Sequence, residues 1–157
     1  MISRWLVVRK MNKHNHYRAL ENMYLAAPIN AFFKPQIEIS EGQAIVTIQV
    51  DESFFHTAGA VHGAVYFKML DDAAFFAANS LELDLFVLTK SFTVRLTRPV
   101  TQGLMRSVGR VVGQDGRQIC AEASVYNSQG QEIGHGSGDF FRGEVAMKSI
   151  PAYQHGE

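Results

Sequence analysis

The stretch His56-Thr-Ala-Gly-Ala-Val-His62-Gly63-Ala-Val-Tyr-Phe-Lys-Met-Leu-Asp71 decides the fold and points to a chemistry. A loop with two histidines and two glycines leads into a nearly apolar segment, which predicts a long buried helix over residues 62–80. Asp71 places a carboxylate in that apolar helix. Such an acid near a helix N-terminus is typical of an active site, because the acid can take a proton while free backbone N–H groups stabilise an oxyanion.

Upstream of this segment the sequence predicts a further helix and a hairpin. Residues 12–27 carry apolar side chains at helical spacing, and Asn12 is a candidate N-cap. Residues 36–50 alternate between apolar and polar side chains on either side of Glu-Gly at 41–42, which predicts two strands joined by a turn.

Downstream, the pattern changes to period two, which predicts four antiparallel strands and therefore an α+β fold in which the sheet covers the long helix. We expect these strands around residues 91–97, 103–113, 117–127 and 131–141, with a hairpin turn at Asp115-Gly116. Gly134, Gly136 and Gly138 face one side of the last strand, so a helix, another subunit or a ligand is expected to pack closely there. The residues after Gly143 have no clear pattern and are expected to fray.

Composition limits the classes of function. The chain of 157 residues has 15 basic and 15 acidic residues, scattered along the sequence, so neither nucleic acid nor a membrane is expected as a partner. Cys120 is the only cysteine, which excludes an internal disulfide and favours a reducing compartment. The apolar run at residues 5–8 is too short for a signal peptide. We therefore expect a soluble cytoplasmic protein.

Two motifs carry a resemblance to a known family. The segment from Gly59 to Asp71, with His62-Gly63 at its centre, resembles the motif of hotdog-fold acyl-CoA thioesterases of the phenylacetic-acid-pathway (PaaI-like) type, in which an acid follows the His by nine residues. The run 92–99, which ends in Arg-Pro, resembles a strand of the same family. The resemblance covers roughly residues 36–142 and implies a sheet wrapped around a central helix.

The resemblance also implies a domain organisation and an activity. We expect a helical extension over residues 1–35, a hotdog thioesterase-like domain over 36–142 and a C-terminal tail over 143–157. The implied activity is hydrolysis of an acyl-CoA to the free acid and CoA by a homodimer or homotetramer, with active sites across the subunit interface. No cofactor is expected, and CoA enters only as part of the substrate.

Asp71 is the expected catalytic residue. Its helical neighbours are apolar, so its carboxylate should lose hydration and its pKa should rise. Asp72 differs because Lys68 stands four residues before it and favours an ordinary ion pair. The resemblance implies that Asp71 is either the general base that activates water or the nucleophile itself, and the sequence does not separate these roles. The alternative is a structural acid held by a backbone or tyrosine donor.

Three residues of the His-Gly loop have expected roles of their own. Gly63 opens the helix, so the resemblance implies that its N–H binds the thioester oxyanion; the alternative is a glycine needed only for a tight turn. His62 is expected to cap the helix or orient the loop beside the substrate. His56 stands where the family usually has Asn, and we expect a polar orienting role, against a loop histidine without catalytic weight.

The remaining candidates concern the water and the acyl group. Thr89 stands where related enzymes place a hydroxyl close to the nucleophilic water, although a strand threonine needs no such role. Phe54, Phe55, Phe67 and Phe75 are candidates for the acyl pocket, with core packing as the alternative for each.

Three other interpretations compete with the thioesterase. A zinc site built from His56, His62 and Asp71 is not expected, because the spacing is not a helical histidine pair and no cysteine assists. A hotdog hydratase or dehydratase of enoyl- or hydroxyacyl-thioesters remains open, since such enzymes bring an acid and a histidine to one carbon. A non-catalytic acyl-CoA binding protein also remains open, although an acid kept on an apolar helix face argues against it.

Overall fold

One antiparallel sheet of six strands wraps around a central helix. The computed structural model describes residues 2–154, with side chains from residue 13 onward, so Met1 and residues 155–157 lie outside it. The helices are α1 (Ile2–Ala26), α2 (Asn30–Phe33) and α3 (Gly63–Ser80), with short 3-10 turns η1 (Glu52–Phe54) and η2 (Met147–Ser149). The strands are β1 (Gln36–Ser40), β2 (Gln43–Gln49), β3 (Leu85–Leu96), β4 (Leu104–Asp115), β5 (Gln118–Tyr126) and β6 (Glu132–Ala146).

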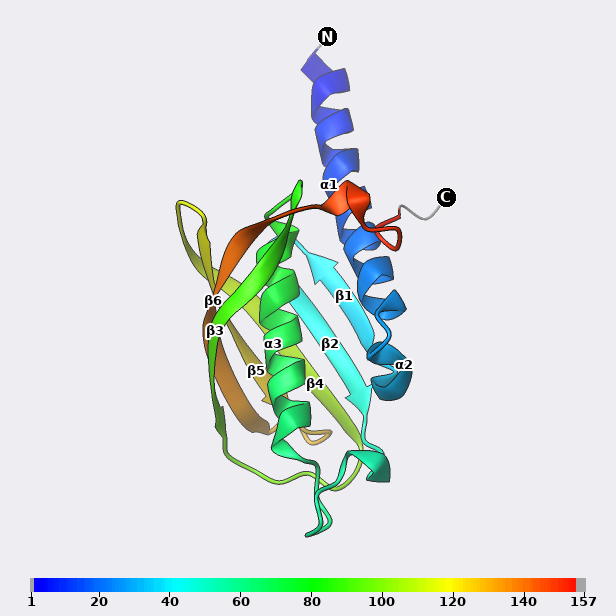
Figure 1. Ribbon diagram of the computed structural model, residues 1–157, viewed down its shortest axis with the longest axis vertical. Coiled ribbons are helices and arrows are strands. Elements are labelled where there is room, and N and C mark those ends of the chain that lie inside the picture. The colour runs from blue at the N-terminus through cyan, green and yellow to red at the C-terminus, as the bar shows by residue number, and fades with distance from the viewer. Residues whose placement is uncertain (1, 155–157) are drawn as a thin grey trace.

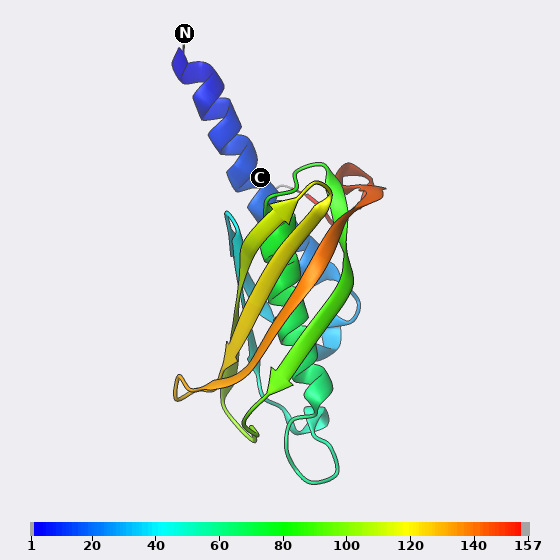
Figure 2. The same cartoon turned by 90° about the vertical axis from the view of Figure 1, so that its left-hand side faces the viewer.

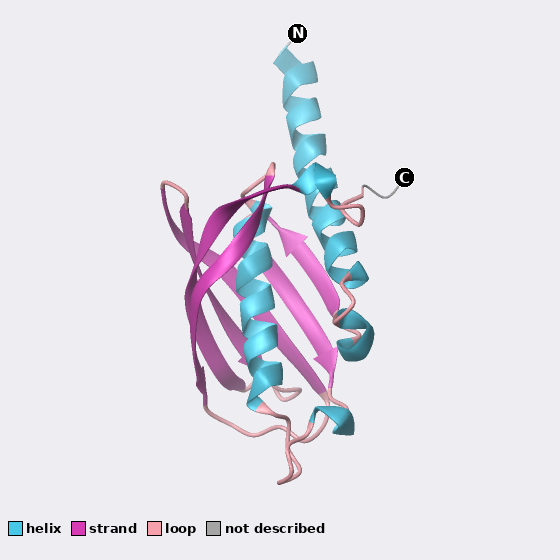
Figure 3. Ribbon diagram, in the orientation of Figure 1, coloured by secondary structure: helices cyan, strands magenta, loops and turns pink. Residues whose placement is uncertain are grey.

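The strand order is β1-β2-β4-β5-β6-β3, with every neighbouring pair antiparallel. Figure 1 and Figure 3 show the sheet curving around α3, while α1 lies beside β1. In the view of Figure 2, β4, β5, β6 and β3 pass in front of α3. The predicted α+β architecture, with its long central helix and its hairpins at 41–42 and 115–116, is confirmed.

Both ends of the chain differ from the sequence expectation. Helix α1 begins at Ile2 and runs through Asn12, so Asn12 is not its N-cap; residues 2–11 contain neither Pro nor Gly, and nothing in them stops the helix. Strand β6 continues to Ala146, and Met147 after it is fully buried, so the described part of the tail does not fray. The segment after β6 returns to α1, where the His16 ring hydrogen-bonds to the Tyr153 hydroxyl at 2.6 Å. The same ring donates to the Asn79 carbonyl of α3 at 2.8 Å.

A row of small residues lets α3 lie close to the sheet. Ala44, Gly109 and Ala123 are paired across the neighbouring strands β2, β4 and β5. On the helix side, Ala73 is fully buried, and a Cβ added at Gly109 would overlap its backbone carbonyl. The absence of a side chain at Gly109 therefore fixes the separation between α3 and the sheet.

Replacing Gly109 with alanine is expected to lower the free energy of unfolding by more than about 3 kcal/mol, because backbone rather than a flexible side chain occupies the space. Gly113→Ala is the matched control on the same strand, since an added Cβ meets nothing within 4 Å there. Urea unfolding of both variants checks this. Equal midpoints for the two would contradict the close packing of α3 on β4.

A side chain from the neighbouring strand β3 fills the space over two of the aligned glycines of β6. We expected a helix, a subunit or a ligand over them, and that expectation is wrong for Gly136 and Gly138. The ring of Phe92 on β3 lies against both, at 2.6 Å from the position that a Cβ at Gly136 would take. Phe92 is paired with Gly138 in the ladder, so a large side chain on one strand is accommodated by glycine on the next.

Candidate active site

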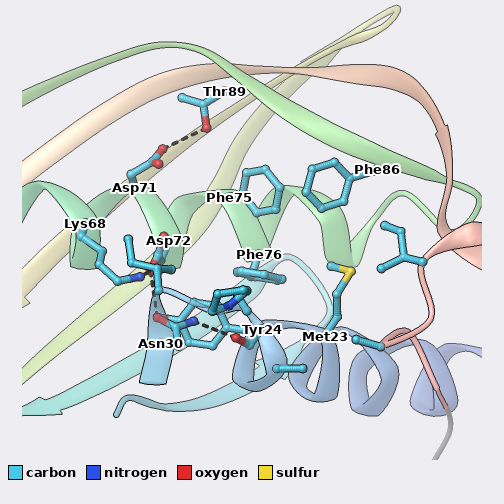
Figure 4. Close-up of a pocket in the computed structure, with 16 residues that line it drawn as sticks. Met23, Tyr24, Asn30, Lys68, Asp71, Asp72, Phe75, Phe76, Phe86 and Thr89 are labelled. Atoms are coloured by element: carbon cyan, nitrogen blue, oxygen red, sulfur yellow. Dashed lines mark hydrogen bonds and ion pairs between the residues drawn. The ribbon is translucent and has the colours of Figure 1, made fainter. Parts of the chain in front are cut away.

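Asp71 lies on the middle of α3 and contacts β3 through one hydrogen bond. The Thr89 hydroxyl donates to Asp71 Oδ1 at 3.1 Å, while Oδ2 has no hydrogen-bond partner in the described part of the chain (Figure 4). Burial raises the pKa of Asp71 to about 6, an effect that the hydrogen bond from Thr89 partly offsets. The predicted rise of this pKa is confirmed. A carboxylate that is partly desolvated, with one oxygen free, suits proton transfer near neutral pH.

An irregularity in β3 brings Thr89 to this carboxylate. Side chains alternate along a strand, so a regular strand would turn Thr89 and Phe92, three residues apart, to opposite faces. The β3–β6 register shifts between Thr89 and Ser91, and Lys90 is left out of the pairing as a bulge. As a result, both Thr89 and Phe92 face α3. A bulge that redirects one side chain is common beside active sites.

Beside Asp71 lies a cavity of about 500 Å³, called the Asp71 cavity from here on. Its lining comes from α3, from Phe86 and Thr89 on β3, from Met23, Tyr24 and residues 26–30 at the α1–α2 corner, and from the segment after β6. Figure 4 shows Asp71 and Thr89 together, with Phe75 and Phe86 following along the cavity. The arrangement places a titratable acid at one end of a mainly apolar pocket, as is usual for sites that bind small molecules.

The charges of the Asp71 cavity other than Asp71 are paired. Lys68 Nζ and Asp72 Oδ2 are 2.6 Å apart, which confirms the predicted ion pair, and both side chains are largely buried. The Tyr24 hydroxyl donates to the same Asp72 oxygen at 2.8 Å. Burial, together with the Asp72 carboxylate, raises the pKa of Tyr24, so it stays a neutral donor. Asp72 is therefore a structural acid that attaches α1 to α3.

The N-terminus of α3 presents a free backbone donor. His62 is the N-cap, and its Nδ1 accepts a hydrogen bond from Ala64 N–H at 2.9 Å, which confirms its predicted capping role. Gly63 follows as the first helical residue, and its N–H has no acceptor among the residues that the structure describes. A donor at the positive end of an 18-residue helix is well placed to stabilise developing negative charge.

His56 and Gly63 share a second cleft. It has a volume of about 360 Å³ and is also lined by Tyr66 and by residues 96–99 at the end of β3. The exposed His56 ring accepts a hydrogen bond from Ala58 N–H at 3.1 Å through Nδ1, which leaves Nε2 to face solvent or a ligand. This Gly63 cleft is separate from the Asp71 cavity.

Within one chain, the two groups expected to act on the carbonyl are too far apart to do so. Gly63 and Asp71 are eight residues apart on a continuous helix. At a rise of about 1.5 Å per residue, they are separated by about 12 Å along the helix axis. A single carbonyl carbon cannot touch both. The structure thus brings Asp71 together with Thr89 and His56 together with Gly63, but it does not join the two pairs in one chain.

The aromatic candidates divide among different places. Phe75 lines the Asp71 cavity. Phe67 is 40 % exposed and packs edge-on against Phe92 at 5.7 Å, outside the lining of that cavity. Phe54 is buried against Phe33 with ring centroids 5.2 Å apart, and Phe55 forms an isolated bridge with Val61.

Sequence reasoning missed the contribution of α1 and of the segment after β6 to the site. Met23, Tyr24 and Ile150 line the Asp71 cavity, although they are distant in sequence from the His-Gly motif. Tyr24 belonged to a helical pattern, but nothing in that pattern indicated its bond to Asp72, which is 48 residues away. A contact of this kind leaves no periodic signal in a single sequence.

Comparisons with known proteins show what this chain is similar to. Residues 58–133 match the family model of the thioesterase superfamily, a segment that includes Gly63, Asp71 and Thr89. A comparison with curated proteins found no matching relative. The similarity to solved structures is extensive in space and low in sequence.

Three of those structures show this combination of a similar fold and a low sequence identity. The PaaI protein of E. coli, from the phenylacetic acid degradation operon, has a TM-score of 0.78 and 20% identity, covering 85% of this chain and 97% of that one. A conserved protein of Pseudomonas aeruginosa has a TM-score of 0.70 and 23% identity, covering 78% and 97%. A thioesterase of Haemophilus influenzae has a TM-score of 0.69 and 15% identity, covering 76% and 85%. The chain therefore has the hotdog fold, and its residues 58–133 match the thioesterase-superfamily model, in agreement with the resemblance seen in its motifs.

Among the described residues, no three His, Cys, Asp or Glu side chains lie close enough together to hold a metal ion. None of the described helices is long and apolar enough to cross a membrane.

Proposed function

We propose that the protein is a homo-oligomeric acyl-CoA thioesterase in which Asp71 of one copy and the Gly63 N–H of another act on the same thioester. The observation that carries this proposal is the Asp71 carboxylate, which is held by Thr89 at the end of an apolar cavity and has a pKa raised to about 6. The thioesterase-superfamily match over residues 58–133 supports the reaction class.

The sheet edges favour assembly through β3. At one edge, β1 is covered by α1, where Glu21 accepts from Ile39 N–H at 2.8 Å and Arg18 donates to Ile39 C=O at 3.0 Å. At the other edge, β3 is open, and its apolar side chains Leu88 and Leu96 are exposed. An open edge of twelve residues invites pairing with another strand, so a second copy is expected to add there.

Within one chain, Gly63 and Asp71 are about 12 Å apart along the helix axis. An assembly through β3 would allow these two groups to come from different copies. A thioester bound between two copies would place its carbonyl oxygen at the Gly63 N–H of one and its carbonyl carbon beside Asp71 of the other. The Gly63 cleft, with His56 beside it, would then receive the CoA side of the substrate. The acyl group would enter the Asp71 cavity.

The chemistry follows from these positions. Asp71 in its ionised form removes a proton from water as the water oxygen attacks the carbonyl carbon, and Thr89 holds the carboxylate in place. Negative charge builds on the carbonyl oxygen, where the Gly63 N–H and the α3 dipole stabilise it. Collapse of the tetrahedral species breaks the C–S bond, and the proton on Asp71 passes to the leaving thiolate. Direct attack by Asp71 through a transient anhydride uses the same groups, and the two routes share the tests below.

This role makes activity depend on the ionisation of Asp71. With a pKa of about 6, the base is ionised above that pH and protonated below it, so kcat/KM is expected to fall as the pH drops through about 6. The Thr89→Val variant loses a hydrogen bond that favours the ionised form, so its profile should shift to higher pH. Initial rates across a pH series check both statements. A flat profile between about pH 5 and about pH 8 would contradict the base role.

The reaction class is tested by following two products from one substrate. Crotonyl-CoA and a panel of saturated acyl-CoAs are incubated with the protein, and free thiol release is measured beside loss of the enoyl absorbance. Thiol release from at least one acyl-CoA is the expected result. Hydration of crotonyl-CoA without thiol release would identify a hydratase, and CoA-ester binding without either reaction would identify a binding protein.

A further inference from the structure

The Asp71 cavity runs from the candidate catalytic carboxylate to the C-terminal end of α1 and to the segment after β6. In Figure 4, Asp71 and Thr89 lie at one end, Phe75 and Phe76 in the middle, and Met23 and Phe86 toward the other end. Met23 comes from the last turns of α1, and Ile150 and Ala152 come from the segment after β6. The hotdog sheet and its helix therefore form only part of the wall.

The middle of the cavity is lined by aromatic rings in fixed mutual contact. Phe75 is 5.0 Å from Phe76 and 5.3 Å from Phe86, measured between ring centroids. Phe76 is in turn 5.0 Å from Tyr24 in an edge-on arrangement. Aromatic rings packed in this way offer a large apolar surface with little freedom to rearrange.

The walls contributed by α1 and by the segment after β6 are held in place. The His16 ring, which is 2 % exposed, bonds to both the Tyr153 hydroxyl and the Asn79 carbonyl. The Asn22 side chain donates to the Gln154 carbonyl at 2.9 Å. These bonds fasten the segment after β6 to α1, so the far end of the cavity is preformed.

Among the described residues that line the cavity, Asp71 is the only charged side chain without a charged partner. Lys68 is paired with Asp72, which also accepts from Tyr24. At the end of the cavity away from Asp71, the lining side chains, Met23 and Ile150 among them, are apolar. An acyl group that carried a carboxylate or an ammonium at its distal end would lose hydration without gaining a partner.

We propose that the C-terminal end of α1 and the segment after β6 determine which acyl groups this thioesterase accepts: Met23, Ile150 and Ala152 form the wall that meets the distal end of the acyl group. The substrate class is a thioester of an uncharged, apolar acyl group, long enough to fill a cavity of about 500 Å³ rather than acetyl. The inference rests on the proposed thioesterase function, because it assumes that the acyl group lies next to Asp71.

Two opposite changes at this wall test the inference. Met23→Ala enlarges the far end, and its matched control is Leu25→Ala, which shortens a neighbouring side chain that is 51 % exposed and outside the cavity lining. Ala152→Phe fills the same end without removing a core side chain. The kcat/KM values are measured for straight-chain acyl-CoAs from acetyl to palmitoyl, and thermal unfolding verifies that each variant is folded.

The expected result is a shift of preference in opposite directions. Met23→Ala should move the optimum to longer acyl groups, and Ala152→Phe should lower the ratio of kcat/KM for long over short acyl groups by at least about tenfold. Leu25→Ala should keep the wild-type preference. Unchanged preference in both cavity variants would overturn the inference while leaving thioesterase activity standing.

A binding measurement tests the assignment of the cavity wall independently of hydrolysis. S-alkyl-CoA thioethers of increasing chain length, which cannot be hydrolysed, are titrated by calorimetry into the wild-type protein and the three variants. If no acyl-CoA is hydrolysed but the length dependence of binding shifts as described, the wall assignment stands and the thioesterase function fails. Absence of both hydrolysis and length-dependent binding would overturn both.

Discussion

Asp71→Asn is expected to lower kcat for every hydrolysed acyl-CoA by about 10²- to 10⁴-fold, the usual contribution of a positioned general base. Asparagine has the shape of aspartate and can still accept the hydrogen bond from Thr89, but it cannot take a proton. The loss should appear in kcat rather than in KM, because the cavity that binds the acyl group is unchanged. Thiol release under saturating substrate measures it.

The same substitution should raise thermal stability at pH 8. Burial raises the pKa of Asp71 from 3.8 to about 6, so between these values the folded state binds a proton that the unfolded state has lost. The free energy of unfolding therefore falls as the pH rises through this window, and the ionised carboxylate remains a cost above it. Asparagine removes that cost. A higher Tm with greatly reduced activity would identify a carboxylate kept for chemistry.

A result of the opposite kind would be equally clear. Near-wild-type hydrolysis by Asp71→Asn would show that the carboxylate is neither base nor nucleophile. A lower Tm together with modestly reduced activity would show that Asp71 is a structural acid, which is the alternative raised by its bond to Thr89.

Gly63→Pro is expected to lower kcat by about 10²- to 10³-fold, the usual effect of removing one oxyanion donor. Proline is well tolerated as the first residue of a helix, where its missing N–H has no helical partner. His62 already has the extended backbone, with φ −63° and ψ 142°, that a residue before proline prefers. The substitution therefore removes the donor while α3 is retained.

Gly63→Ala is the matched control for this change. It keeps the N–H and adds a Cβ that comes within 3.2 Å of the Leu96 side chain, a contact that a small side-chain movement can relieve. Comparison of kcat for the two variants separates the effect of losing the N–H donor from the effect of filling the space beside Gly63. Equal losses in both would mean that Gly63 is needed for close packing and not as an oxyanion donor.

The sequence predicted the parts of the site that depend on local pattern. The apolar helix, its His62 cap and the Lys68–Asp72 pair all follow from spacing within a few residues, and each is present. The raised pKa of Asp71 followed from its apolar neighbours on the same helix. These features depend on contacts between residues close in the chain, where periodicity carries the information.

The parts that could not be predicted depend on pairing between distant segments. The bulge at Lys90 that turns Thr89 toward Asp71 arises from the register of β3 against β6, and alternation within β3 does not reveal it. Phe92 over the β6 glycines is likewise a contact between strands. The bond from Tyr24 to Asp72 joins two helices.

The central claim, that one copy provides Asp71 and another provides Gly63 for the same thioester, is tested most directly with a mixed oligomer. Asp71→Asn and Gly63→Pro chains carrying different affinity tags are co-expressed, the mixed species is purified through both tags, and its thiol release is compared with that of each variant alone. In a mixed dimer, one site would combine an intact Asp71 with an intact Gly63, so about half of the wild-type activity is expected while both parent variants remain nearly inactive. A mixed oligomer no more active than its parents would contradict the account.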